Sequence, residues 1–436
     1  MTTQRPTQYL SAALACAVSL QANFTLAQAP AAPAPVPATV PVATPVIYEE
    51  LPTLDASVIL QPQYFQGANF TVRKSVPSSS GANQYVIDSD YGVFTANGNA
   101  MLVRRISEIN GIAKLRAVSK GDEFGKAAKR AAKAPLETGR RLIEDPVNTI
   151  AAVPKGIVGF LGKAKDAVQG AVENRPSNPQ DGGAVAKLTG FSKAKRNLAI
   201  SVGVDPYSTN EIFQSDLQKV AWPVFSGGFV VNLGMAAVPG GAGMALGAVN
   251  LTGNLEASLR EKSPSELRKM NLEQLQRIGV ADSVANDFLN NVAISPTIQT
   301  ILVDALSHLG SIPGQTDFVA QAAACAGEYE AVAYMQSAEL MEQVNVVSPV
   351  ARITELGGLP LCETRDGGVI IPIQWDYVAW TPMAEQFALK LKARQFATPV
   401  TRYTLMLTGV ASPTATHELA KLGITVAPVA LPGPLK

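Results

Sequence analysis

One stretch of the sequence, from Val220 to Leu255, contains no charged side chain and constrains the fold more than any other feature. Pro239-Gly240-Gly241 divides it into apolar pieces of 19 and 14 residues. A membrane-spanning helix needs about 20 mostly apolar residues, so neither piece predicts an independent span. We expect a tight helical pair inside the fold, because apolar runs are usually interior. Gly243 and Gly247 have the small-residue spacing that lets two helices approach closely.

Two other interpretations of this stretch stay open. A glycine-rich apolar hairpin from Gly227 to Gly253 could insert into a membrane. Alternatively, Gly241-Ala242-Gly243 resembles the start of a phosphate-binding G-x-G-x-x-G loop. The sixth position of that pattern is Leu246, however, and no clear strand precedes it. Ligand binding is therefore the weaker of the two alternatives.

The first residues predict an exported protein. Arg5 precedes an uncharged Ala/Leu-rich run over 9–20, which is typical of a signal peptide, and we expect it to span 1–27 with cleavage after Ala27. Lipidation of Cys16 and a retained anchor are the alternatives. Residues 28–45 are rich in proline and alanine and predict an extended tether. We expect the mature protein in the periplasm or outside the cell, in association with the envelope.

Cleavage would leave Cys325 and Cys362 as the remaining cysteines. An even count in an oxidising compartment favours a disulfide between them. Two unrelated buried thiols are the alternative explanation.

The order of patterns predicts an α+β, helix-rich fold in three parts. Residues 46–173 form a small α+β unit with a basic helical extension, and the linker 174–184 follows it. Residues 185–348 are a helical core that includes the glycine-rich apolar hairpin. Residues 349–436 are a C-terminal α/β unit.

In the first part, strands are expected over 69–76, 84–88 and 92–96. Apolar residues at helical spacing then predict a helix packed on this small sheet. These residues are Leu102, Ile106, Ile109 and Ala113.

In the helical core, helix boundaries can be predicted from capping residues. Ser263 and Glu266 have capping-box spacing, and Ser295-Pro296 opens another helix. Gly279 and Gly310 stand where helices would end. We expect Thr316 to cap the longest helix, which should end near Met341. The segment Val204 to Asn210 predicts a turn that starts a helix, with Asp205 or Ser208 as its cap.

In the C-terminal part, alternating side chains predict a half-buried strand from Val369 to Tyr377, joined to the preceding strand through Asp366-Gly367-Gly368. Helices should open at Thr381-Pro382 and Ser412-Pro413. Strands are expected over 403–407 and 424–429. Strand, helix and strand in this order predict parallel pairing through a right-handed crossover.

Charge is distributed unevenly. Between Ala113 and Lys165 there are twelve Lys or Arg against five Asp or Glu, whereas 281–345 contains eight acidic residues and no Lys or Arg. Four cations share one face of an expected helix, and an apolar stripe follows it. The cations are Lys126, Lys129, Arg130 and Lys133, and the stripe includes Ile157, Phe160 and Leu161. This pattern indicates contact with an anionic membrane surface or a protein partner. Solvated faces, or basic helices docked on acidic ones, are the alternative.

Catalytic side chains are few. His308 and His417 have no metal-ligand partners at a useful spacing, so no metal or cofactor is predicted. Ser192 and Lys195 have S-x-x-K spacing without the accompanying motifs. No nucleic-acid partner is expected, because aromatic residues do not interleave with the cations.

These observations predict an exported, non-catalytic envelope or interaction protein, peripheral at a membrane surface. One alternative is an enzyme whose ligand site lies at the carboxyl ends of the C-terminal parallel strands, near Thr408-Gly409 and Ser412. The other is a membrane-inserting or pore-forming protein that uses the apolar hairpin.

Overall fold

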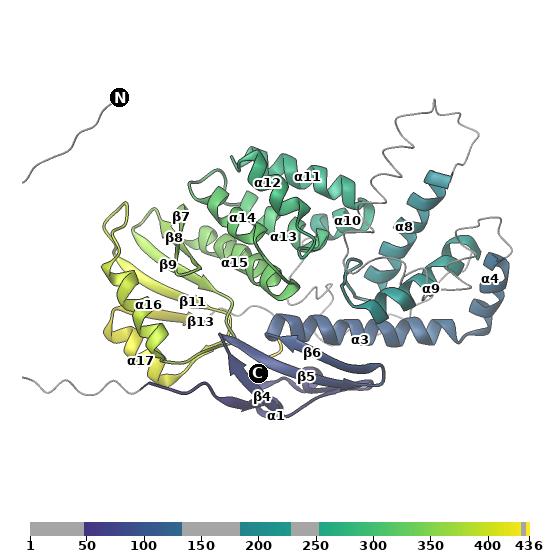
Figure 1. Cartoon of the computed structure of the whole chain (residues 1–436), viewed down its shortest axis with the longest axis horizontal. Helices are drawn as coiled ribbons and strands as arrows, with labels where there is room; N and C mark the ends of the chain where they lie inside the picture. The colour runs from purple at the N-terminus through teal and green to yellow at the C-terminus, as the bar shows by residue number, and fades with distance from the viewer. Residues whose placement is uncertain (1–47, 133–183, 228–252, 429–432) are drawn as a thin grey trace, which may run out of the picture. The chain divides into compact units, whose positions relative to one another are not determined.

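The N-terminal strands form an antiparallel sheet. The computed structural model describes residues 48–132, 184–227, 253–428 and 433–436 (Figure 1). The strands follow the order β1-β4-β5-β3-β2, and β6 pairs with β5. Tyr85 and Ile87 of β5 are buried while Gln84 and Asp88 are exposed, which is the period of two expected of a sheet with one covered face. The bounds are β1 Thr53–Asp55, α1 Ala56–Ile59, α2 Pro62–Phe65, β2 Gln66–Gly67, β3 Phe70–Val72, β4 Ser75–Ser79, β5 Ala82–Ser89 and β6 Gly92–Asn97.

A long helix, α3 (Asn99–Ser119), follows β6 directly and carries the predicted apolar stripe. Leu102, Ile106 and Ile109 are buried in the core that includes the sheet. Further along, α3 packs against α9 (Glu211–Gly227), and α4 (Asp122–Ala132) packs against the same helix (Figure 1). The predicted helix on a small sheet is therefore confirmed.

The central region is helical, and its predicted boundary signals hold. Ser263 and Glu266 form a capping box, and the Ser295 hydroxyl accepts a hydrogen bond from the Ile298 N–H. Gly279 and Gly310 both have positive φ after a helix. The helices are α8 Ala184–Ser201, α10 Gly253–Glu261, α11 Pro264–Arg277, α12 Asp282–Asn290, α13 Pro296–Ser307, α14 Gln315–Ala323 and α15 Glu328–Val347.

Two predictions for this region are wrong. The expected long helix is two helices, because α14 ends before Gly327 and α15 begins after it, and Thr316 is no cap since Gly314 precedes α14. The cap of α9 is neither Asp205 nor Ser208. The Asn210 side chain accepts the hydrogen bond from the Phe213 N–H instead.

The C-terminal region is a mixed five-stranded sheet in the order β13-β11-β9-β8-β7. The strands β9, β11 and β13 are parallel, whereas β7 and β8 are antiparallel to their neighbours. Thr381 and Ser412 cap the two helices, as predicted. The elements are β7 Val350–Leu356, β8 Leu359–Thr364, β9 Gly368–Ile373, β10 Tyr377–Val378, α16 Pro382–Ala393, β11 Arg402–Leu407, β12 Val410–Ala411, α17 Pro413–Lys421 and β13 Ile424–Pro428.

Strand β9 is fully buried, so the prediction of a half-buried strand is wrong. Ile370 belongs to the core shared with α13 and α15, whereas Val369, Ile371 and Ile373 belong to a second core with α16 and α17. A central strand covered on both faces is apolar at every position. Alternate residues of β9 face opposite sides of the sheet. The sequence pattern could not show whether the second side faces another core or solvent.

Residues Tyr48 to Lys436 form one compact unit. The main core joins side chains of the N-terminal sheet, the helices and the C-terminal sheet, such as Val72, Ile301 and Ile353. The chain end returns to α1 and α2, because the Lys436 N–H donates to the Ile59 carbonyl at 2.9 Å. The fold is thus mixed α+β and helix-rich, and the three-part division stays a prediction.

Candidate functional site

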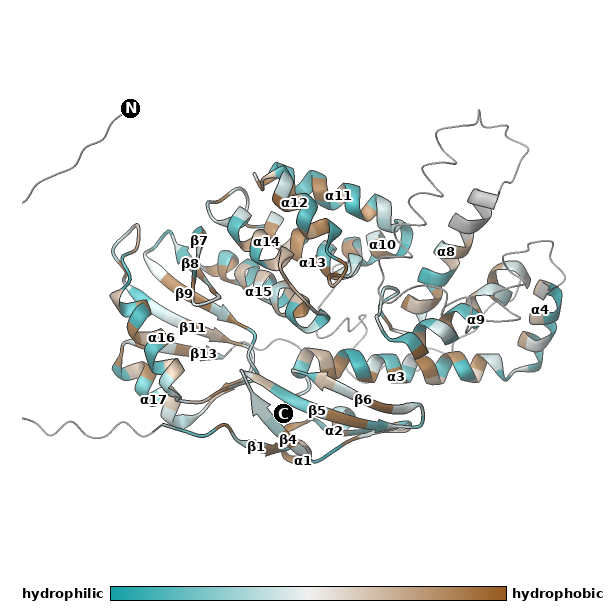
Figure 2. Ribbon diagram, viewed as in Figure 1, coloured by the Kyte–Doolittle hydropathy of each residue, from teal (hydrophilic) through white to brown (hydrophobic). Residues whose placement is uncertain are grey.

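The basic helix α4 is the predicted contact surface that the structure describes best. Lys126, Lys129 and Arg130 are exposed, whereas Ala127 and Ala131 are buried on the opposite side. In the hydropathy colouring, hydrophilic segments lie beside apolar ones along α4 (Figure 2). The predicted amphipathic face therefore forms on these three cations. Lys133, Ile157, Phe160 and Leu161 lie outside the described residues, as do Gly243 and Gly247.

The described ion pairs of the basic segment do not involve the acidic segment. Arg116 binds Asp216 of α9 at 2.6 Å, and Lys126 binds Glu123 one turn before it at 2.8 Å. Neither acid belongs to the acidic segment 281–345. For Lys129 and Arg130, no ion pair forms with any acid in the described ranges. Lys129 and Arg130 are thus exposed cations that no acid of the described residues neutralises.

The acidic segment contributes instead to a buried ionic network that sequence reasoning missed. The Arg104 Nη2 lies 3.1 Å from Asp205 Oδ2 and 3.1 Å from Glu328 Oε1. Arg105 bridges Glu328 and Glu108, at 2.9 and 2.8 Å. Burial raises the pKa of Glu328, but the two arginines lower it further and hold it below its usual range. The network ties α3 to the start of α15.

The turn at 204–210 serves this network. Asp205 accepts a hydrogen bond from Thr297 of α13 at 2.8 Å, and Glu108 accepts one from the Ser208 hydroxyl at 2.6 Å. Asp205 is thus a network member rather than a helix cap. The adjacent cations Arg104 and Arg105, which stand between the stripe residues Leu102 and Ile106 in the sequence, are a signal that the sequence offers.

The two predicted disulfide partners are free thiols. Both are buried in the main core, where burial raises the pKa of each thiol to about 12. Cys362 lies in β8 and pairs in register with Ile353 and Ile370 on its two neighbouring strands. Each sulfur is a small apolar group in the core, and the predicted bridge is wrong.

The histidines and the S-x-x-K pair form no catalytic arrangement in the described structure. The His308 Nδ1 lies 2.6 Å from Glu342 Oε1, and His417 is exposed on α17. Ser192 is exposed on α8, while burial lowers the pKa of Lys195 to about 8. No group of three His, Cys, Asp or Glu side chains could hold a metal ion within the described ranges.

The carboxyl ends of the parallel strands, the predicted enzyme site, are filled by the chain itself. A Cβ on Gly409 would lie 2.1 Å from the Asp376 carbonyl oxygen, so β11 and the segment after β9 touch there. The Ser412 hydroxyl caps α17 and donates a hydrogen bond to Glu49. At this edge, Gly409 thus packs against Asp376, and Ser412 binds Glu49.

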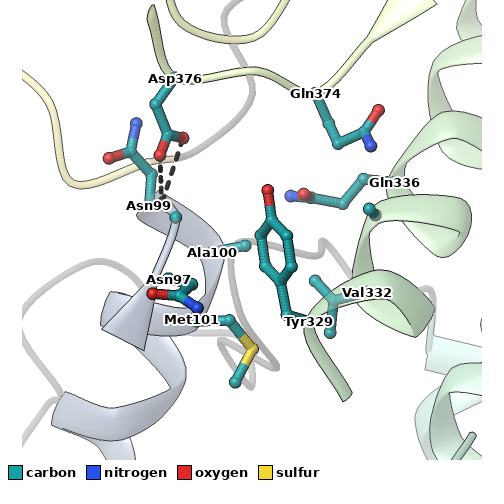
Figure 3. Close-up of a pocket in the computed structure, with 11 residues that line it drawn as sticks. Asn97, Asn99, Ala100, Met101, Tyr329, Val332, Gln336, Gln374 and Asp376 are labelled. Atoms are coloured by element: carbon teal, nitrogen blue, oxygen red, sulfur yellow. Dashed lines mark hydrogen bonds between the residues drawn. The ribbon is translucent and has the colours of Figure 1, made fainter. Parts of the chain in front are cut away.

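One small cavity does lie beside this edge (Figure 3). Asp376, just beyond β9, directs its carboxylate at the first residues of α3. It accepts hydrogen bonds from the Asn83 N–H at 2.8 Å and from the Asn99 N–H at 3.1 Å. Burial raises the pKa of Asp376, and the two hydrogen bonds offset only part of this effect. The resulting pKa is about 7.

The Asp376 junction continues into the N-terminal sheet. The Asn99 side chain accepts a hydrogen bond from the Tyr85 hydroxyl at 2.6 Å, and Asn83 accepts one from Ser78 at 2.7 Å. Sequence reasoning missed the junction. The available signal was that Gly98, just before α3, has no side chain to cap the helix.

None of the described helices has the length and apolar character needed to cross a membrane, and the stretch between Gly227 and Gly253 lies outside them.

Comparisons with protein-family models, with curated proteins and with solved structures find no match to this chain.

Proposed function

We propose that this chain is an exported, non-catalytic envelope protein that rests on an anionic lipid surface through α4. Export rests on the expected signal peptide over 1–27, which lies outside the described residues. The proposal depends on one observation: Lys126, Lys129 and Arg130 project from α4, while its alanine face packs inward.

The charge arrangement supports a lipid rather than an internal partner. Among the described residues, Lys126 forms an ion pair with Glu123 alone, and both side chains are well exposed, at 65% and 72%. Exposed ion pairs contribute little and are screened by salt, so this pair would not prevent Lys126 from meeting a phosphate. Polybasic helices bind anionic headgroups through the surface potential of the membrane. The apolar stripe that we expect to begin at Ile157 would insert into the lipid and so strengthen the binding that the cations provide.

Vesicle flotation of the full-length protein tests the proposal. We expect binding to phosphatidylcholine vesicles that contain phosphatidylglycerol, no binding to phosphatidylcholine alone, and release at high salt because the Debye length shrinks. The triple substitution K126E/K129E/R130E should reduce binding at least about tenfold, since each cation contributes to the surface attraction.

The matched control is K269E/R277E/K390E. It changes the net charge by the same amount at cations that are also exposed, on α11 and α16. It should retain binding. Absence of binding to anionic vesicles at low salt, or equal loss in both triple variants, would refute the lipid proposal.

The pore-forming alternative stays a prediction, because its hairpin lies outside the described residues. Dye release from the same vesicles addresses it directly. Flotation without release would favour peripheral attachment.

A further inference from the structure

The cavity beside Asp376 has the size of one small ion. Its volume is about 10 Å³, close to the minimum that holds a single water molecule. It lies where three segments meet: the turn before α3, the first half of α15, and the residues after β9 (Figure 3). A substrate of ordinary size does not fit, whereas a group as large as one water does.

The lining mixes polar and apolar side chains, the latter including Met101 and Val332, and its only charged group is a carboxylate. Asn97, Tyr329, Gln336 and Gln374 surround the space with Asp376, and no Lys or Arg lines it. Asp376 is only 5% exposed. Its Oδ2 accepts from two peptide N–H groups, whereas its Oδ1 shares only the Asn99 N–H. Oδ1 therefore retains capacity to bind a further group.

Two polar side chains point into the cavity without a partner. Gln336 is 7% exposed, and its amide turns toward the Tyr329 hydroxyl (Figure 3). Neither the Gln336 amide nor the Tyr329 hydroxyl makes a hydrogen bond within the part of the chain that the structure describes. Gln336 is largely buried and Tyr329 is half-buried, and the amide of a buried glutamine normally has a hydrogen-bond partner.

We propose that the cavity binds one monovalent cation of the size of ammonium or potassium, held by oxygens of Asp376, Tyr329, Gln336 and Gln374. A buried carboxylate without a cationic neighbour favours a positive ligand and repels an anion. A magnesium or calcium site would need more anionic oxygens than this one carboxylate supplies. Because the first turn of α3 already offsets part of the charge, we expect a Kd on the order of 1 mM.

Binding should be linked to the ionisation of Asp376. The cation prefers the carboxylate, so affinity should rise between about pH 6 and pH 8, as Asp376 loses its proton with a pKa of about 7. The nearest titratable neighbours are Tyr329 on α15 and Tyr85 on β5. Burial raises the pKa of both phenols above 10, so they stay neutral in this range.

Thermal unfolding of the full-length protein at pH 8 tests the proposal. Ammonium and potassium chloride should raise Tm saturably, by about 2 to 5 °C, over tetramethylammonium chloride at equal ionic strength. Tetramethylammonium supplies the same charge but is too large for the cavity.

The variants assign the effect to the cavity. D376N should abolish the ion-specific shift, and Y329F and Q336M should each reduce it. Y334F is the matched control, because Tyr334 lies on the same helix but does not line the cavity, and it should retain the full shift. If D376N fails to fold, the ion-specific Tm shifts of Y329F and Q336M test the proposal instead. Equal Tm values in all three salts, or an undiminished shift in Y329F and Q336M, would overturn the proposal.

Discussion

The Asp376 carboxylate lies 3.1 Å from the backbone nitrogen of Asn99, with 277 positions between them in the sequence. Asn99 is the first residue of α3, and Gly98 before it supplies no side-chain cap. The C-terminal region therefore caps a helix of the N-terminal region. A carboxylate is well suited to this place, because the first peptide N–H groups of a helix are unpaired and carry partial positive charge.

Replacing Asp376 with Asn should alter how stability depends on pH. Burial raises the pKa of Asp376 in the folded protein to about 7 from 3.8. The unfolded chain therefore loses this proton first, and the group reduces stability as pH rises toward 7. Asn does not titrate, so D376N lacks this loss. From pH 5 to 7, the unfolding free energy of D376N minus that of wild type should therefore increase by about 1 kcal/mol per pH unit. Urea unfolding at each pH measures it, and parallel curves would contradict the assignment.

Replacing Gly98 with Ala should destabilise the protein. Gly98 has φ +88°, and an added Cβ would lie 3.3 Å from the Tyr329 ring. We expect a loss of about 1 to 3 kcal/mol, because an L side chain rarely adopts this conformation. G125A in α4 is the matched control, since a Cβ there meets no atom within 4 Å. G125A should stabilise the protein slightly. Chemical denaturation of both variants measures the two changes in unfolding free energy.

Removing Arg104 should be costly. R104M leaves Asp205 and Glu328, which are 4% and 12% exposed, without their shared cation. Glu328 keeps Arg105, whereas Asp205 loses its cation, and breaking a buried ion pair typically costs about 3 to 5 kcal/mol. R73M is the comparison, because the Arg73–Asp88 pair is half-exposed and should contribute far less. If the two variants lose equal stability in urea unfolding, the network is not a structural core.

Cys325 and Cys362 should behave as buried free thiols. In the native protein, iodoacetamide should modify neither, because burial holds both pKa values near 12. After denaturation without reductant, mass spectrometry should find both peptides alkylated. A peptide pair that remains linked until reductant is added would show a disulfide.

Local signals predicted several helix starts and the parallel pairing of the last two C-terminal strands. Ser263, Ser295, Thr381 and Ser412 each cap the helix that follows, since capping involves only neighbouring residues. The failures have a different origin. Gly327 separates α14 from α15 within one apolar pattern. Asn210 caps α9 because it directly precedes the first helical residue, whereas Asp205 lies six residues before Glu211 and binds Arg104 and Thr297.

The sequence by itself determined where helices and strands form, that the central helices need burial, and that α4 has a cationic face, because spacing and capping are properties of neighbouring residues. Only the tertiary structure decided the partners of buried polar groups. Asp376 meets Asn99, and Arg104 meets Glu328, because burial removes water and each group must then find a partner from another part of the chain.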